Sequence, residues 1–120
     1  MIGSTRNLAV YAAPAPTDMR KGFDGLFALV RDVIKQNPLS GHLFLFVAKN
    51  RKRAKVLFWD GTGLCIFHKR LEQGRFVAPW ERPSPTMTAT ELALLLEGSR
   101  AVKTSLSPEQ FLRPTASSAR

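Results

Sequence analysis

The sequence predicts an α+β domain: an antiparallel sheet of four to five strands, one main helix packed on it, and a short C-terminal helix. Two observations carry this prediction. Apolar residues recur at helical spacing between residues 23 and 34, and strand-like apolar runs follow, separated by turn residues, over 42–48, 54–60 and 64–71. With 120 residues, 44% of them hydrophobic, the chain can bury one core. We expect a single domain over residues 1–112 and a flexible basic tail over 113–120.

The first elements are a short strand over residues 8–13 and the main helix. Pro14 and Pro16 require an extended connection between them. Thr17 or Asp18 is a candidate helix cap, because a side-chain oxygen can accept from the first free amides, although Gly22 and Gly25 move the expected start toward Asp24. One helical face then carries Phe23, Leu26, Phe27, Val30, Val33 and Ile34, and Asn37-Pro38 ends the helix.

The strands that follow are joined by short turns. Asp60-Gly61-Thr62-Gly63 supplies the residues that a tight hairpin needs between the runs 54–60 and 64–71. Glu72-Gln73-Gly74 predicts another turn, and residues 75–78 predict a fourth short strand after it.

The central strands are apolar on both alternations: Leu43, Leu45 and Val47 oppose Phe44 and Phe46. Such a sheet is covered on both faces. One helix cannot cover both, so we expect self-association or a protein partner on the second face. The alternative cover is the short helix over residues 91–97, which Thr88 and Glu91 begin with a capping box and Gly98 ends.

A cationic tip separates the first two of these strands. Residues 49–55 contain five positive charges and no acidic residue: Lys49, Arg51, Lys52, Arg53 and Lys55. Such a segment repels itself and is stabilised when an anion lies across it, and the commonest anion with charges in line is a phosphate backbone. A solvated turn that happens to be rich in Lys and Arg is the structural alternative.

The positive charge is concentrated around this tip. The chain has 18 Lys and Arg against 9 Asp and Glu, a formal net charge of +9, and residues 49–82 alone carry nine basic and three acidic residues. Clustered basic charge favours nucleic acid as the partner. An acidic protein is the second possibility. A membrane surface is disfavoured, because the sequence has neither a basic amphipathic helix nor a lipidation signal.

The sequence gives no positive case for catalysis. The acidic residues are scattered over caps, turns and helix faces, whereas a metal nuclease needs two or three converging carboxylates. His42 and His68 lie at strand edges, and Cys65, the only cysteine, lies in an apolar run that indicates an inert core thiol. We therefore expect a non-enzymatic protein without cofactor or metal, and the absence of a secretion signal favours the cytoplasm.

Four segments in succession resemble one family. They are Thr17–Leu26 (TDMRKGFDGL), Pro38–Phe44 (PLSGHLF), Lys55–Leu64 (KVLFWDGTGL) and Lys69–Phe76 (KRLEQGRF). The succession, over roughly residues 6–98, resembles the TnpB-type accessory proteins encoded by the second open reading frame of bacterial insertion sequences of family sixty-six. The resemblance implies a role in DNA transposition beside a separate transposase, and it supplies no catalytic residues to carry over.

Charge and resemblance together predict an accessory protein that binds DNA through the cationic tip. Further basic residues are expected to assist the tip: Arg20, Lys21, Lys69, Arg70 and Arg75. Such contacts hold the phosphate backbone and carry no sequence information. The rival hypothesis is a protein–protein adaptor that docks on the transposase through Phe58, Trp59 and Trp80 without touching DNA.

Overall fold

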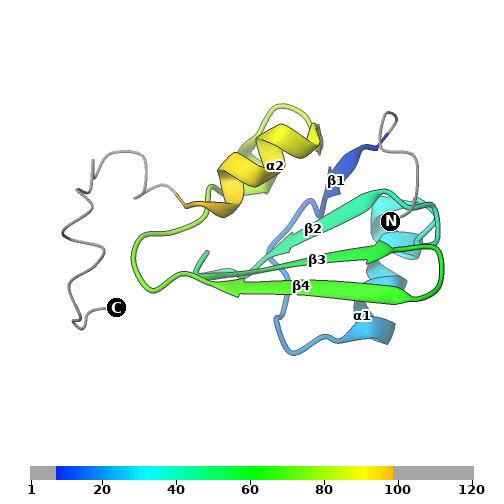
Figure 1. Ribbon diagram of the computed structural model, residues 1–120. Coiled ribbons are helices and arrows are strands. Elements are labelled where there is room, and N and C mark those ends of the chain that lie inside the picture. The colour runs from blue at the N-terminus through cyan, green and yellow to red at the C-terminus, as the bar shows by residue number, and fades with distance from the viewer. Residues whose placement is uncertain (1–7, 99–120) are drawn as a thin grey trace.

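The computed structural model describes residues 8–98, which form a five-stranded sheet with a helix on each face (Figure 1). The strand order is β4-β3-β2-β1-β5. The strands are β1 (Val10–Ala12), β2 (Leu43–Val47), β3 (Arg53–Trp59), β4 (Leu64–Arg70) and β5 (Thr86–Met87). The expected tail over residues 113–120 and the end of the expected domain at residue 112 lie outside the described residues.

The α+β class is confirmed, but the sheet is mixed rather than antiparallel. β1 runs parallel to β2, with Tyr11 opposite Phe44, whereas β2, β3 and β4 pair antiparallel. The reason is the connection: a helix lies between β1 and β2 in the chain, and a helical crossover brings the next strand back in the same direction. The alternation of apolar residues does not report strand direction, so the sequence pattern missed this.

The strand expected over residues 75–78 does not form. This segment is irregular, although Phe76 is fully buried in it. The fifth strand is instead the two-residue β5, which pairs antiparallel with β1. Pro79 begins a single 3-10 turn, η2 (Pro79–Glu81), and a bent segment without regular structure leads from it to β5.

The main helix begins later than the cap residues suggested. α1 (Phe23–Leu29) continues directly into a π-helical turn, η1 (Val30–Ile34), and its N-cap is Gly22, without a capping side chain. Asp18 therefore does not cap the helix; its Oδ1 accepts from the amide of Arg20 over 2.9 Å. Leu26 is fully buried as expected, but Phe23 is 49% exposed, so the expectation that its ring packs under the sheet was wrong.

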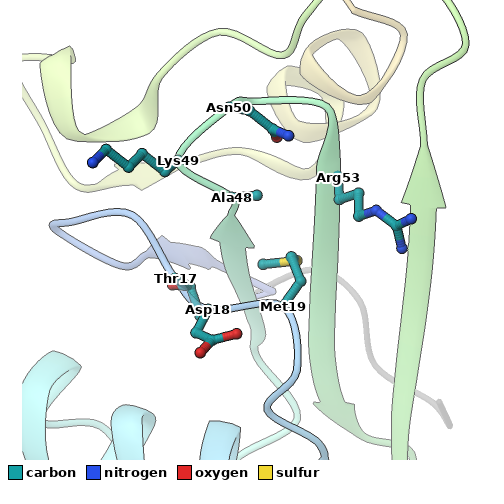
Figure 2. Close-up of a pocket in the computed structure, with 7 residues that line it drawn as sticks. All are labelled: Thr17, Asp18, Met19, Ala48, Lys49, Asn50 and Arg53. Carbon is teal, nitrogen blue, oxygen red and sulfur yellow. The ribbon is translucent and has the colours of Figure 1, made fainter.

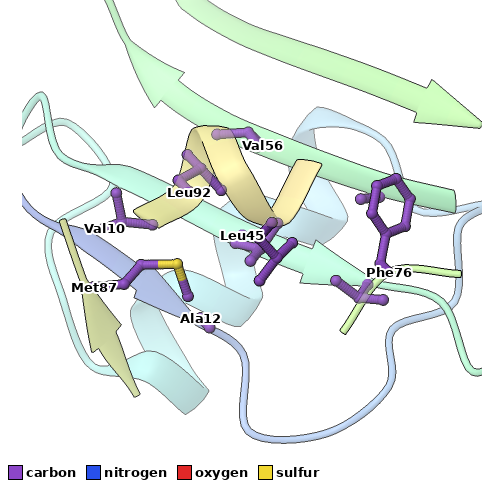
Figure 3. Close-up of a cluster of buried hydrophobic side chains, with 10 residues drawn as sticks. Val10, Ala12, Leu45, Val56, Phe76, Met87 and Leu92 are labelled. Atoms are coloured by element: carbon purple, nitrogen blue, oxygen red, sulfur yellow. The ribbon is translucent and has the colours of Figure 1, made fainter. Parts of the chain in front are cut away.

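The two faces of the sheet carry separate cores. The α1 face buries Phe44, Phe46 and Leu57 against Leu26 and Val30. The opposite face is covered by α2 (Ala89–Leu96) and contains Val10, Leu45, Val56, Phe76, Met87, Leu92 and Leu95 (Figure 3). Within the described part of the chain, α2 covers the second face. The expectation that a partner is needed to cover this face, because one helix cannot cover both, therefore does not hold for the centre of the sheet.

The expected capping box of α2 is confirmed. The hydroxyl of Thr88 accepts from the amide of Glu91 over 3.0 Å, and the Glu91 carboxylate accepts from the amide of Thr88 over 2.8 Å. At the other end, Gly98 takes a positive φ of 87° that other residues rarely adopt. Along residues 8–98, no helix has both the length and the apolar character of a membrane span.

Candidate nucleic-acid interface

The β2–β3 connection, residues 48–52, is compact and hydrogen-bonded, and its last four residues, 49–52, are called here the tip loop. The amide of Ala48 donates to the carbonyl of Arg53, and the amide of Arg51 donates to the carbonyl of Ala48, both over 2.9 Å. Within the loop, the side-chain oxygen of Asn50 accepts from the amide of Lys52 over 2.9 Å. Arg51 takes a left-handed conformation, φ 60°, to close the turn.

A second segment, residues 71–76, braces the tip loop from outside. The amide of Leu71 donates to the carbonyl of Lys52 over 2.8 Å, and the amide of Phe76 donates to the carbonyl of Arg51 over 2.7 Å. The Lys52 ammonium completes the brace by donating to the carbonyl of Gly74 over 3.1 Å. Both of these loop carbonyls are therefore satisfied by the second segment, and Arg75 lies in that segment, next to Phe76.

The five charges of the expected tip do not share one environment. Lys49 is exposed, and Arg51, Lys52 and Arg53 are half-buried. Lys55 is only 9% exposed, and its Nζ donates to the carbonyl oxygen of Lys21 over 2.8 Å. The exposed part of the tip therefore ends near Arg53, because Lys55 lies inside β3 and is held by the segment before α1.

None of these five cations forms an ion pair with a carboxylate anywhere in residues 8–98. Other basic residues differ in this respect. Arg20 contacts Asp18 over 2.7 Å, and Arg70 contacts Glu72 over 2.9 Å. The side-chain hydrogen bond from Arg20, with that from its amide, holds the pKa of Asp18 well below its usual range.

The positive charges continue across β3 and β4 on the α1 face. Arg53 lies directly opposite Arg70, and Lys55 lies opposite His68. Like charges in such cross-strand pairs repel. Desolvation lowers the pKa of His68 from its ordinary value, and the charges of Lys55 and Arg53 lower it further. The site thus carries a positive field in which neutral histidine is favoured.

The remaining basic residues named from the sequence lie around this surface. Lys21 and Arg75 are exposed, and Lys69 is half-buried. Lys69 lies opposite Ala54, hence on the α2 face of the sheet, away from Arg53 and Arg70. The structure therefore brings Lys49, Arg51, Lys52, Arg53 and Arg75 to the tip, while Lys69 points to the other face.

An open pocket lies between the tip loop and the segment that precedes α1; we call it the tip pocket. Its volume is about 590 Å³, and it is lined by Thr17, Asp18, Met19, Ala48, Lys49, Asn50 and Arg53 (Figure 2). The Met19 side chain lies between that segment and strands β2 and β3, and Lys49 and Arg53 extend to opposite sides of Ala48 (Figure 2). The sequence reasoning missed this pocket, because its two walls lie some 30 positions apart in the chain.

The proposed partner-binding aromatic residues are not the most accessible ones. Phe58 and Trp80 are half-buried against the α2-face core, and Trp59 is also half-buried. Phe67, which the sequence analysis did not single out, is 46% exposed on the edge strand β4, opposite Val56. The sequence could have indicated this residue, because the alternation of side chains along β4 places Phe67 on the same face as Cys65 and Lys69.

The histidine and cysteine side chains considered for catalysis lie in surroundings that favour a structural role. The Nδ1 atom of His42 accepts from the amide of Ala9 over 3.0 Å. Desolvation raises the pKa of the Cys65 thiol, and its contact with Asp60 raises it further, which disfavours the reactive thiolate. Among residues 8–98, no group of three or more His, Cys, Asp or Glu side chains is arranged to hold a metal ion.

Comparison with known proteins identifies the family. The family model described as IS66 Orf2-like protein matches residues 8–105. The chain is also similar to two proteins of Sinorhizobium fredii, each over 99 residues and 82% of this chain. The uncharacterized protein y4hO is 42% identical with 86% of its length covered, and the uncharacterized protein y4jC is 37% identical with 85% covered. No solved structure matches the chain. The match spans the sheet, both helices and the braced tip loop, and the chain belongs to the IS66 Orf2-like family of insertion-sequence accessory proteins.

Proposed function

We propose that this accessory protein binds DNA during transposition by laying the tip loop and Arg53 against the phosphate backbone, and that it assists a separate transposase without catalysing a reaction itself. The observation that carries the proposal is a hydrogen-bonded loop whose cations have no carboxylate partner in the described residues. A braced loop loses little conformational freedom on binding, so more of the electrostatic attraction appears as affinity.

The basic residues should bind phosphate with different strengths, because some of their charged groups already have a partner in the protein and others do not. Within residues 8–98, the charged groups of Lys49, Arg51 and Arg53 have no hydrogen-bond partner, and Lys52 retains further N–H donors beyond the one given to Gly74. Arg75 and Lys21 widen the surface on either side. Arg20 and Arg70 contribute less, because each first has to share its guanidinium with a carboxylate.

Salt dependence tests the proposal directly. If Lys49, Arg51, Lys52 and Arg53 each neutralise one phosphate, log affinity for duplex DNA falls with log salt at a slope of about −3.6, which is about 150-fold between about 50 and 200 mM. The variant with Lys49→Gln, Arg51→Asn and Arg53→Gln should reduce the slope by about 2.7. Asparagine suits the left-handed position of Arg51.

The matched control is Lys35→Asn. Lys35 is also exposed and left-handed, with φ 64°, but it ends η1, before β2, whereas the tip loop follows β2. Its replacement should leave both slope and affinity close to wild type. The proposal fails if the triple variant binds DNA as the wild type does.

One observation favours the adaptor as a second candidate function. Phe67 is exposed on β4, which is an edge strand and therefore has backbone donors and acceptors available to another strand. The occupant would be the transposase or a second copy of this chain. Binding by this route should persist in high salt and after nuclease treatment, and Phe67→Ser should weaken it. A 13.3 kDa monomer at micromolar concentration that does not bind purified transposase would exclude this function.

A further inference from the structure

The tip pocket combines an apolar floor with basic residues, and a nucleotide has an aromatic base and a phosphate that suit the two. Met19 is half-buried against the α1-face core, and Ala48 is almost fully buried, so the floor is apolar. Lys49 and Arg53 also line the pocket, and their side chains extend from it to opposite sides of Ala48 (Figure 2). The pocket is open to solvent, and its volume of about 590 Å³ leaves room for a single nucleobase.

Asn50 adds a directional group at the rim. Its Oδ1 is occupied by the amide of Lys52 at 2.9 Å, which orients the carboxamide and leaves both N–H donors of Nδ2 without a partner in residues 8–98. Such donors match the ring nitrogen and carbonyl acceptors of a nucleobase. The thioether of Met19 is a favourable neighbour for an aromatic ring.

The one negative group of the pocket is neutralised. The Asp18 carboxylate accepts from the Arg20 guanidinium at 2.7 Å and 3.1 Å and from the Arg20 amide at 2.9 Å. Phosphate at Lys49 or Arg53 therefore does not face a free carboxylate, and the pocket tolerates an anion at its rim.

We propose that the tip pocket receives one unpaired nucleobase of DNA, while the flanking phosphates lie on Lys49 and Arg53. The proposal rests on the proposed DNA binding and adds a ligand to it: an extrahelical or single-stranded nucleotide rather than intact duplex. A base in the pocket stacks against Met19 and accepts from Asn50. The protein then distinguishes distorted or open DNA from a regular helix, through a contact that phosphate binding alone does not provide.

Three DNA probes of equal length test this. One is a perfect duplex, the second has a single bulged 2-aminopurine, and the third has an abasic bulge, which keeps the extra phosphate but lacks the base. The base bulge should bind about 2- to 12-fold more tightly than the abasic bulge, from the usual contribution of a contact between a thioether and an aromatic ring. The fluorescence of 2-aminopurine should change on binding, because the base moves to a new environment.

Two variants locate the effect in the pocket. Met19→Ala removes the apolar floor, and Asn50→Asp keeps the acceptor for the Lys52 amide but replaces the two donors by a negative charge. Both should bring the affinities for base and abasic bulges together. Gln36→Asp, which adds one negative charge just after η1, serves as the charge control and should preserve the preference.

The outcomes separate the two proposals. Equal affinity for base and abasic bulges in the wild type, together with salt-dependent duplex binding, overturns the nucleobase site and leaves the phosphate contact standing. A preference that survives both Met19→Ala and Asn50→Asp places the base elsewhere and also overturns it. If no probe binds at low salt, both proposals fail.

Discussion

The side-chain ammonium of Lys55 donates a hydrogen bond to the main-chain carbonyl oxygen of Lys21 over 2.8 Å, although the two residues are 34 positions apart. This contact ties β3 to the segment that leads into α1. It also separates Lys55 from the other cations of the run that begins at Lys49, because a lysine that is only 9% exposed and bonded to the main chain is poorly placed to contact DNA.

We expect Lys55→Met to lower the free energy of unfolding by about 1 kcal/mol, because the variant removes a partly buried hydrogen bond. Lys49→Met, at an exposed position, should change it by no more than about 0.5 kcal/mol. Urea unfolding measures both. In DNA binding the order should reverse: Lys49→Met loses about 0.9 of the salt slope, and Lys55→Met loses none of it. Equal effects of the two changes in either assay would contradict the assignment of Lys55 to stability and of Lys49 to DNA binding.

The helix α1 should depend on one of its two first apolar residues far more than on the other. Leu26 is fully buried, so Leu26→Ala should cost about 2–5 kcal/mol of unfolding free energy. Phe23 is 49% exposed, and Phe23→Ala should cost clearly less. Chemical denaturation of the pair decides this, and a larger loss for Phe23 would show that its ring is buried in solution.

The capping box of α2 should make a measurable contribution to stability. Thr88→Ala removes the hydroxyl that accepts from the Glu91 amide and should cost about 1 kcal/mol. Thr88→Ser should restore most of the loss. Thr90→Ala, two positions further into the helix, makes the same chemical change without a cap and should be nearly neutral. The thermal unfolding midpoints compare the three, and indistinguishable midpoints for Thr88→Ala and Thr90→Ala would rule out the cap as a stabilising contact.

Asp60 should contribute to the acid sensitivity of the fold. Hydrogen bonds from the amides of Thr62 and Gly63 lower its pKa to about 2 from an ordinary value of 3.8. Because the folded state holds the ionised form, the stabilisation is complete above the ordinary pKa and disappears as the pH falls toward 2. Asp60→Asn retains an acceptor and should flatten the stability–pH curve between about pH 4 and 2. Parallel curves for variant and wild type would refute this role.

Much of the fold follows from local patterns, and the misses have physical causes. The period of α1 predicted the burial of Leu26, and the turn chemistry of Asp60–Gly63 predicted the β3–β4 hairpin. The parallel direction of the β1–β2 pair was missed because the apolar alternation does not report strand direction, and β5 was missed because a strand of two residues is too short to show a period of two. The burial of Phe23 was predicted wrongly, because helical spacing shows which residues share a helix face but not how far the sheet extends beneath that face.

The candidate site was visible as charge but not as shape. The cations at 49–53 are evident in the sequence, whereas the brace from Leu71 and Phe76 depends on where the chain returns after β4. The tip pocket likewise needs Met19 and Ala48 to meet. These are contacts between distant segments, and no local propensity encodes them.

The interior position of β1 has a consequence for synthesis on the ribosome. β1 lies between β2 and β5, so residue Val10, among the first of the domain to be made, pairs with Leu43 on one side and with Met87 on the other. The α2-face core joins Val10 to Leu92 and Leu95, which emerge last. A nascent chain that ends before these residues leaves one apolar face of its sheet uncovered and open to aggregation. We expect the domain to reach its native state only once α2 is free of the exit tunnel, and holding factors to matter most just before that moment.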